Sequence, residues 1–219
     1  MLVLALDTAT PTLVAGVAEV TSRTVDGALV LPAQRSVRVL AERALPSGNR
    51  HAELLTPAVR EVLAEAGLRV RDLGALVVGL GPGPFTGLRV GIVTAAALGD
   101  VVGPVYGVCS LDAVGDGARS VVTDARRKEV HWAVYDADGQ RVAGPGVDRP
   151  EEAPVTEPVV GDDRFAERLG RPVTPTEVTT AGLLRAAAPL FDRPPAPLEP
   201  LYLRRPDAVP PAARKAVSR

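Results

Sequence analysis

The sequence has few of the residues on which disulfides, metal centres and nucleophilic catalysis depend. It contains one cysteine, Cys109, and two histidines, His51 and His131, among 219 residues. A single cysteine excludes an internal disulfide, and so few Cys and His side chains do not make a structural zinc site. No G-x-S-x-G motif occurs, and His51 belongs to His-Ala-Glu-Leu-Leu rather than to H-E-x-x-H. We therefore expect no metal, no cofactor and no nucleophile–base pair.

Strong net charge and long uncharged runs are also missing. Lys and Arg number 25 against 26 Asp and Glu, so the net charge of −1 gives no overall footprint for nucleic acid or anionic lipid. The first residues lack a basic segment and reach Asp7, which is not typical of a signal peptide. The longest nearly uncharged stretch, 90–98, is shorter than the roughly 20 residues of a membrane span. We expect a cytoplasmic protein that does not bind membranes.

Hydrophobic residues are abundant, at 46% of the chain, which is too many for general disorder. In the first half, apolar alternation and turn residues predict extended segments, and apolar spacing of three and four residues predicts amphipathic helices. Asn49 and Gly67 are expected to cap the first helix, and Pro57 to kink it. The predicted elements are strands at 2–6, 12–20, 28–31 and 36–40 with Pro32 between the last two, a helix at 49–66, a strand at 75–80, a helix at 88–98 and a strand at 105–109.

The second half predicts an antiparallel sheet followed by a mixed region. Its predicted elements are a short helix at 110–113, strands at 120–123, 129–135, 141–147 and 159–160, and helices at 164–169 and 177–190. We expect an N-terminal lobe at 1–104 that carries partner-binding helices, a C-terminal lobe at 105–195, and a mobile, Pro-rich basic tail at 196–219.

The turn Gly81-Pro-Gly-Pro-Phe-Thr-Gly87 lies between a strand and a helix, where helix N-termini bind anions. The third glycine comes one residue late for a dinucleotide fingerprint, and the Lys-Ser/Thr pair of a P-loop is absent. Pro82 and Pro84 also lack the N–H groups that would hold a phosphate. The pattern favours a rigid turn that seats the following helix.

Asp7 ends the first strand, where actin-like and ribonuclease H-like folds place a carboxylate for Mg²⁺ or phosphate chemistry. One carboxylate does not make a site. Asp112 and Asp124, the other candidates, are equally well explained as a helix cap and a turn residue. A nuclease is therefore disfavoured.

The second helix has almost no polar surface. Gly87, Gly91, Ala95 and Gly99 recur every four residues, and Arg89 and Thr94 are its only polar groups between Leu88 and Leu98. A glycine inside a helix costs about 1 kcal/mol relative to alanine, so a close backbone approach is expected to offset it. A helix with no face suited to water predicts a protein partner, unless the C-terminal half folds back over it.

Six segments together resemble the TsaB (YeaZ) family, which is required for threonylcarbamoyladenosine in bacterial tRNA. They are Asp7-Thr-Ala-Thr10, Asn49-Arg-His-Ala-Glu-Leu-Leu55, Val78 to Gly91, Gly107-Val-Cys-Ser-Leu-Asp-Ala113, Asp124-Ala-Arg-Arg-Lys-Glu-Val130 and Leu201-Tyr-Leu-Arg204. They occur in order over nearly the whole chain, and residues 150–195 match most loosely.

The resemblance implies an α/β protein with the actin-like ATPase (ASKHA, ribonuclease H-like) fold, in two lobes that each have a mixed sheet flanked by helices. It implies a non-catalytic subunit that binds the catalytic paralogue TsaD, together with the ATPase TsaE, through a helical bundle, and that meets tRNA only through the complex. A homodimer is expected in isolation. The implied interface residues are His51, Leu54, Leu55, Ala58, Val62, Leu88, Gly91, Ile92, Ala95 and Ala96.

The catalytic paralogue of this family carries an H-x-x-x-H metal pair, which an ungapped placement puts at Ser110 and Val114 here. These side chains do not make a metal site. A vestigial nucleotide site would consist of Asp7, Thr8, Gly81, Gly83 and Thr86. The alternative function is therefore a small phosphotransferase or hydrolase that binds ATP with Asp7 and the turn at 81–87.

Overall fold

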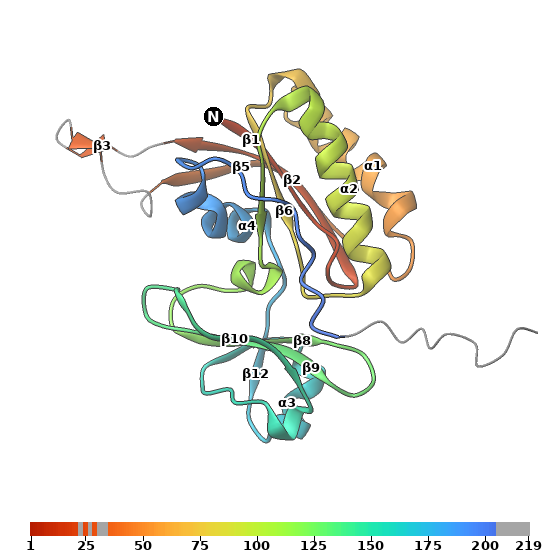
Figure 1. Cartoon of the computed structure of the whole chain (residues 1–219), viewed down its shortest axis with the longest axis vertical. Coiled ribbons are helices and arrows are strands. Elements are labelled where there is room, and N and C mark those ends of the chain that lie inside the picture. Colours follow the sequence, from red (N-terminus) through yellow and green to blue (C-terminus); the bar gives the residue numbers. More distant parts are fainter. Residues whose placement is uncertain (22–23, 26–27, 30–34, 205–219) are drawn as a thin grey trace, which may run out of the picture.

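The computed structural model describes residues 1–21, 24–25, 28–29 and 35–204. It contains two five-stranded sheets that lie one above the other in Figure 1, and a two-stranded ribbon of β3 (Thr24–Val25) and β4 (Ala28–Leu29). Pro32, predicted to interrupt the third strand, lies outside the described residues.

The first sheet has the strand order β5-β2-β1-β6-β7. β1, β2 and β5 pair antiparallel, whereas β6 is parallel to β1 and β7 is parallel to β6. Successive residues of β1 enter different cores, since Val3 and Ala5 face one side and Leu4 and Leu6 the other, as the twofold period of a strand requires. The strands are β1 (Leu2–Asp7), β2 (Thr12–Thr21), β5 (Ser36–Pro46), β6 (Ala75–Gly79) and β7 (Val105–Val108).

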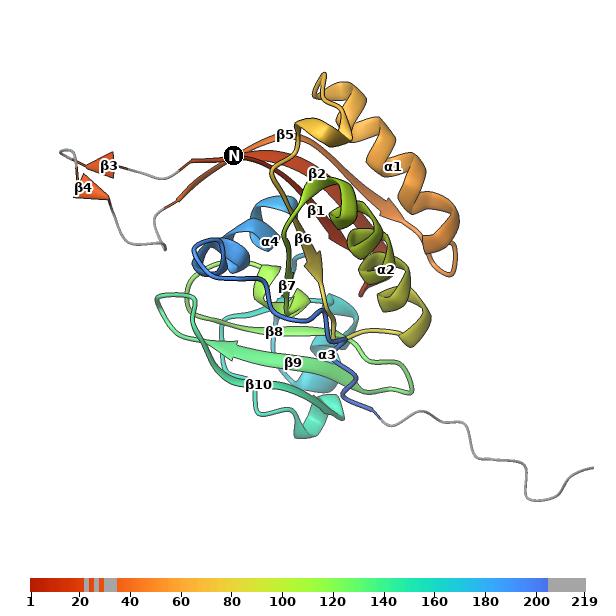
Figure 2. The same cartoon turned by 45° about the horizontal axis from the view of Figure 1, so that its top comes forward.

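Helices α1 (His51–Glu65) and α2 (Phe85–Val102) cover one face of this sheet, and their apolar sides form a core with Leu4, Leu6 and Leu76 (Figure 2). The predicted cap at Asn49 is wrong, because Arg50 occupies the N-cap position and makes no side-chain cap bond. Gly67 does end the helix, with a φ of +67° and an N–H bonded to the Ala64 carbonyl. A short 3-10 turn, η2 (Val70–Asp72), leads to β6.

The opposite face of the first sheet packs against α4 (Thr180–Ala187) and the 3-10 turn η3 (Ser110–Ala113). These elements share one hydrophobic core with both sheets, in which Val77 of the first sheet and Val121 and Ala133 of the second take part. The second half of the chain therefore folds back onto the first sheet, but on the face away from α1 and α2.

The second sheet has the order β10-β9-β8-β11-β12, and its far face packs on α3 (Ala166–Leu169). β12 was not predicted, because its three residues carry too short a pattern. The predicted helix at 177–190 begins later, at Thr180, where the Thr179 side chain accepts the Gly182 N–H. The strands are β8 (Arg119–Asp124), β9 (Val130–Tyr135), β10 (Arg141–Asp148), β11 (Val159–Gly161) and β12 (Val173–Pro175), and the remaining 3-10 turns are η4 (Pro150–Glu152), η5 (Asp163–Phe165) and η6 (Ala188–Leu190).

The final described segment returns along the first lobe. Leu198 packs against the core beneath α1 and α2, and the Leu201 N–H donates to the Leu80 carbonyl at 2.8 Å. Residues 196–204 of the predicted tail thus have defined contacts, and 205–219 lie outside the described residues. The lobe boundary at residue 104 stays a prediction, although the first sheet itself continues to Val108.

By length and composition, α2 qualifies as a helix that could cross a membrane, the one such helix in the described part of the chain. The uncharged stretch 90–98 predicted too short a helix, because α2 continues past Arg89 at one end and past Asp100 at the other. One side of α2 nevertheless packs on the sheet.

Candidate functional site

The outward side of α2 is exposed and rich in apolar side chains, with Thr86, Arg89 and Asp100 exposed among them. Val93 and Val101 keep 64% and 69% of their surface accessible, Phe85 keeps 46%, and Ala96 and Ala97 are exposed beside them. These five exposed residues are called the outer α2 face below, and α2 itself lies on the outside of the first sheet (Figure 1). Several exposed apolar side chains on one helix are typical of a protein-binding site.

The predicted interface residues lie mostly on the inward side of the two helices. Of the ten, Leu54 is half-buried and Ala96 is exposed, whereas the other eight are buried in the chain's own structure. These eight leave a partner little surface to contact, and their place in an interface stays a prediction. The eight are His51, Leu55, Ala58, Val62, Leu88, Gly91, Ile92 and Ala95.

The small-residue stripe of α2 serves the contact with the first loop of the same chain. The Thr8 hydroxyl donates to the Gly87 carbonyl at 2.7 Å and accepts the Gly91 N–H at 3.1 Å. A Cβ at Gly87 would lie 2.6 Å from the Thr8 carbonyl oxygen, and one at Gly91 would lie 2.4 Å from the Thr8 hydroxyl oxygen. The predicted close approach is confirmed, and it explains why glycine stands at both positions.

His51 is a buried, hydrogen-bonded residue. Its Nε2 lies 2.9 Å from the Ser47 hydroxyl and 2.9 Å from the Thr10 carbonyl oxygen. These contacts tie the start of α1 to the first loop, which agrees with the prediction that His51 packs or hydrogen-bonds.

An aromatic cluster continues the outer α2 face at its N-terminal end. The rings of Phe85 and Tyr202 lie 5.1 Å apart, and the Arg89 guanidinium lies 3.8 Å from the centre of the Phe85 ring. Arg89 also donates to the Tyr202 hydroxyl at 3.4 Å. Tyr202 is 40% exposed, so the last described segment adds a further aromatic surface to this face.

Asp7 is sealed inside the molecule. Its side chain has no accessible surface, and its carboxylate accepts the Ser110 hydroxyl at 2.5 Å and the Ala9 N–H at 2.9 Å. A Cβ at Gly79 would lie 1.8 Å from its Oδ2. Burial raises the pKa of Asp7 to about 6, although both hydrogen bonds act to lower it. The carboxylate is therefore held by the protein's own groups and has no face open to a ligand.

The turn at 81–87 packs against the first loop and η3. The Gly81 N–H donates to the Ser110 hydroxyl at 3.2 Å, and a Cβ at Gly83 would lie 2.3 Å from the Ala9 carbonyl oxygen. Thr86 is exposed at the start of α2. The residues predicted for a nucleotide site are thus neighbours, but the structure uses them to seat α2, as the rigid-turn interpretation predicts.

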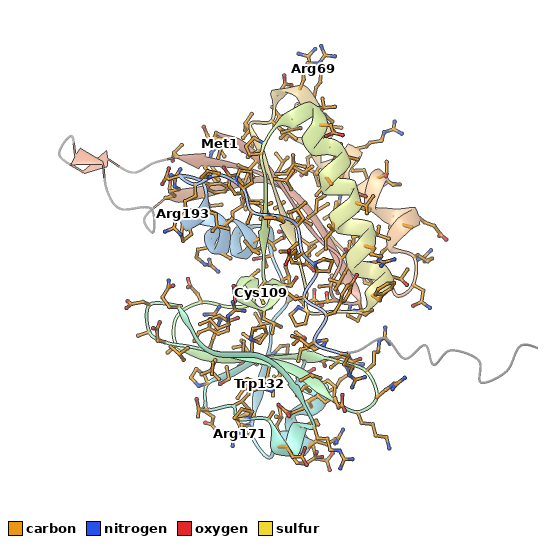
Figure 3. All side chains as sticks on the ribbon, viewed as in Figure 1. Met1, Arg69, Cys109, Trp132, Arg171 and Arg193 are labelled. Carbon is orange, nitrogen blue, oxygen red and sulfur yellow. The ribbon has the colours of Figure 1, made fainter. Side chains whose placement is uncertain are left out.

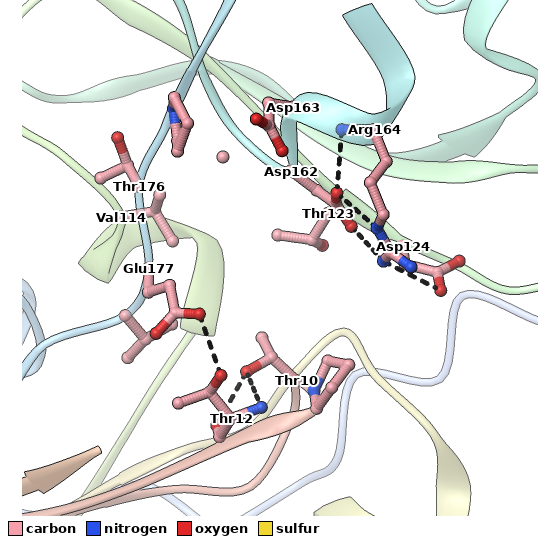
Figure 4. Close-up of a pocket in the computed structure, with 14 residues that line it drawn as sticks. Thr10, Thr12, Val114, Thr123, Asp124, Asp162, Asp163, Arg164, Thr176 and Glu177 are labelled. Carbon is pink, nitrogen blue, oxygen red and sulfur yellow. Dashed lines mark hydrogen bonds and ion pairs between the residues drawn. The ribbon is translucent and has the colours of Figure 1, made fainter. Parts of the chain in front are cut away.

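A cleft of about 410 Å³ lies between the two lobes (Figure 4). Four carboxylates line it, from Asp124, Asp162, Asp163 and Glu177, against the single guanidinium of Arg164. Arg164 is already paired with Asp162 at 2.5 Å. An acidic surface disfavours a polyphosphate, and neither Asp7 nor the turn at 81–87 belongs to the lining.

Cys109 and the two positions aligned with the paralogue's metal pair are buried. Cys109 lies between the lobes (Figure 3), and burial raises the pKa of its thiol to about 12, which leaves no thiolate for attack. Ser110 and Val114, placed at the paralogue's metal pair, are both buried. Within residues 1–21, 24–25, 28–29 and 35–204, no three His, Cys, Asp or Glu side chains gather closely enough to hold a metal ion.

Sequence reasoning missed Val93, Val101, Phe85 and Tyr202 as surface residues. The sequence showed that α2 has almost no polar side, which indicated that the helix is covered. It did not indicate which side of the helix faces the sheet. The glycines supply that information, because the stripe that allows close backbone approach is the side that packs.

Comparisons with known proteins place the chain among tRNA-modification proteins. The model of the family described as TsaD, tRNA N6-adenosine threonylcarbamoyltransferase, matches residues 43–192. An uncharacterized protein of Mycobacterium tuberculosis is 48% identical over 216 residues, which are 95% of this chain and 94% of the relative. The tRNA threonylcarbamoyladenosine biosynthesis protein TsaB of Escherichia coli is 34% identical over 135 residues, or 57% of this chain and 56% of that protein.

The solved structure of YeaZ from Pseudomonas aeruginosa superimposes with a TM-score of 0.67 and 25% identity, and covers 92% of this chain and 99% of its own. The predicted fold class is therefore confirmed: two lobes, each a mixed sheet flanked by helices, in the actin-like, ribonuclease H-like arrangement.

Proposed function

Because the chain belongs to the TsaB/YeaZ family, we propose that it is the non-catalytic subunit of the bacterial complex that makes N6-threonylcarbamoyladenosine in tRNA. In this proposal the chain binds and activates the catalytic subunit TsaD, and the ATPase TsaE joins the complex. Transfer of the threonylcarbamoyl group to adenosine takes place on TsaD, in the cytoplasm.

The observation that carries the proposal is the exposed outer α2 face. Burying a valine or phenylalanine side chain stabilises a complex by roughly 1.5–3 kcal/mol, so Val93, Val101 and Phe85 together can supply the apolar centre of a stable interface. The neighbouring helix α1 adds Leu54, which is half-buried. Two helices from each subunit would then form the bundle that the family resemblance implies.

The closed state of Asp7 supports a role without catalysis. In an actin-like phosphotransferase this carboxylate faces the nucleotide cleft, whereas here Ser110, Ala9 and Gly79 enclose it. The alternative function, a small ATP-dependent phosphotransferase or hydrolase, relies on Asp7 and the turn at 81–87, and neither reaches the cleft. We therefore place the reacting groups on the partner.

The same surface accounts for the expected homodimer. In the purified chain the outer α2 face lacks its partner, and a twofold axis would bring the same face of two copies together. We propose that copies of the chain pair through the outer α2 face and that TsaD displaces this pairing.

The proposal is tested with two valines that are equally exposed. Val93 is 64% exposed on α2, and Val142 is 62% exposed on β10 in the other lobe. Val93→Asp is expected to abolish co-elution with TsaD and tRNA modification by the reconstituted complex, because it places a charge in the apolar centre. Val142→Asp, with the same change of charge at equal exposure, is expected to leave both unchanged. Undiminished complex formation by Val93→Asp would refute this interface.

A further inference from the structure

Three consecutive basic residues occupy one exposed turn of the chain, although its net charge is −1. The tight turn between β8 and β9 carries Arg126, Arg127 and Lys128, all exposed. It protrudes from the second sheet beside the point where the described chain ends (Figures 1 and 2).

The backbone of this turn has an unusual conformation. Its three basic residues have φ angles of +65°, +52° and +66°, in the left-handed region that side chains other than glycine rarely adopt. The Arg126 N–H donates to the Asp124 carboxylate at 2.7 Å, and the Lys128 carbonyl accepts from the Arg168 guanidinium at 2.9 Å. Three consecutive strained residues that their neighbours hold in place are typical of functional positions rather than of a simple connection.

Few carboxylates neutralise the turn. Arg126 and Lys128 make no ion pair within the described part of the chain, and the adjacent Glu129 is paired with Arg204. That pair joins the turn to the end of the described chain. The sequence that follows, 205–219, adds Arg205, Arg214, Lys215 and Arg219 against Asp207 alone. The turn and Arg204, far apart in the sequence, are thus joined through Glu129.

We propose that the turn at 126–128 binds the phosphate backbone of the tRNA on which the complex acts. This inference rests on the proposed function, and it replaces the expectation that the chain meets tRNA only through its partners. The three residues at the tip of the turn are all cationic, so the tip offers no apolar anchor for a protein interface or a bilayer. Cationic side chains on a protruding turn are sufficient to bind phosphates. Phosphate contacts contribute affinity but do not read the nucleotide sequence.

The test uses the full chain in its complex with TsaD and an unmodified tRNA transcript, with binding followed by fluorescence anisotropy at several salt concentrations. Arg126→Gln with Lys128→Gln is expected to raise the Kd at least about fivefold near 0.1 M salt. It is also expected to lower the slope of log K against log salt by about 1.5, since each phosphate contact contributes about 0.7–0.9.

The matched control is Arg71→Gln with Arg193→Gln. Both arginines are exposed and make no ion pair within the described residues, and they lie away from the turn, Arg71 beside Arg69 and Arg193 on the opposite side of the molecule (Figure 3). This control is expected to bind tRNA like the wild type. An unchanged Kd and slope for the Arg126/Lys128 variant would overturn the proposal.

Co-elution with TsaD separates this proposal from the proposed function. The Arg126/Lys128 variant is expected to co-elute with TsaD as the wild type does. If it loses TsaD while the tRNA affinity of the remaining complex is unchanged, the turn contacts protein and the proposal is wrong. If Val93→Asp leaves TsaD binding intact, the interface is wrong, but the effect of the turn on tRNA affinity is still measured.

Discussion

Helices α1 and α2 lie side by side on the same face of the first sheet, and their outward sides differ in chemistry (Figure 2). α1 presents Glu53, Arg60, Glu61 and Glu65 to solvent, and Arg43 of β5 pairs with Glu61 at 3.1 Å and Glu65 at 2.6 Å. α2 presents mainly Val93, Ala97 and Val101, with Arg89 and Asp100 as its exposed charges. Their inward sides are alike, because both fill the same core.

This difference distinguishes the side chains that the fold needs, on the inward sides of the helices, from those that serve binding, on the outward side of α2. α1 shows that a helix at this place in the fold remains compatible with a charged exterior, so the apolar exterior of α2 serves no purpose in the isolated lobe. The inward glycines of α2, by contrast, are needed for the contact with Thr8. Substitutions on the two sides of the layer should therefore act on different properties.

The largest expected effect is on the inward side. Leu88 is fully buried, so Leu88→Ala is expected to lower the free energy of unfolding by about 2–5 kcal/mol through lost burial and a residual cavity. Val93→Ala on the outward side is expected to change it by less than about 0.5 kcal/mol. Urea unfolding followed by circular dichroism measures both. Equal losses at low protein concentration would mean that the outer α2 face is covered within a single chain.

The burial of Asp7 predicts how the free energy of unfolding depends on pH. Its pKa rises from an ordinary value of 3.8 to about 6 on folding, so the folded state binds the proton more tightly than the unfolded state. The contribution of Asp7 to stability is therefore present below about pH 4 and is lost as the pH rises through 6. At about 1.4 kcal/mol per pKa unit, the loss is about 3 kcal/mol.

Asp7→Asn is expected to remove this pH dependence and to raise stability at pH 7 relative to the wild type. Parallel urea titrations at pH 5 and pH 7.5 measure the change. A wild-type protein that gains stability over this interval relative to Asp7→Asn would contradict the closed carboxylate site.

A smaller effect is expected where the first loop meets α2. Thr8→Val keeps the shape of a fully buried side chain but removes the hydroxyl that bonds Gly87 and Gly91, and it is expected to cost about 1–2 kcal/mol. Thermal unfolding measures the cost. Binding of TsaD per folded molecule is expected to stay unchanged, because Thr8 faces away from the outer α2 face; a specific loss of binding would show that the two sides of the helix are coupled.

The sequence predicted most elements of the first lobe, because long periodic segments such as 49–66 and the strand–turn–helix at 75–98 carry strong signals. It missed β12 and misplaced the start of α4, where three-residue strands and the Thr179 cap are decided by local contacts. It also predicted that Leu55 and Ile92 face a partner. Both are buried against the sheet, so a charge at either position would unfold the chain before it could test binding.

The residues predicted for a nucleotide site also show that contacts between distant segments cannot be predicted from local sequence patterns. Asp7, Gly81 and Gly83 lie near one another, since strand ends and the turn meet at one edge of a sheet. Whether that edge is open or closed depends on Ser110, which is 103 residues away and donates to Asp7. No local pattern specifies this contact.

Composition and periodicity alone determined that this chain forms an α/β fold with an unusually apolar second helix, because hydrophobic spacing fixes the type of element and the amount of surface that avoids water. Only the tertiary structure decided which side of that helix faces the sheet, that Asp7 is enclosed, and that Arg204 pairs with Glu129 beside the turn at 126–128. These are contacts between distant segments, and their geometry depends on how the sheets and helices pack around each other rather than on the order of neighbouring residues.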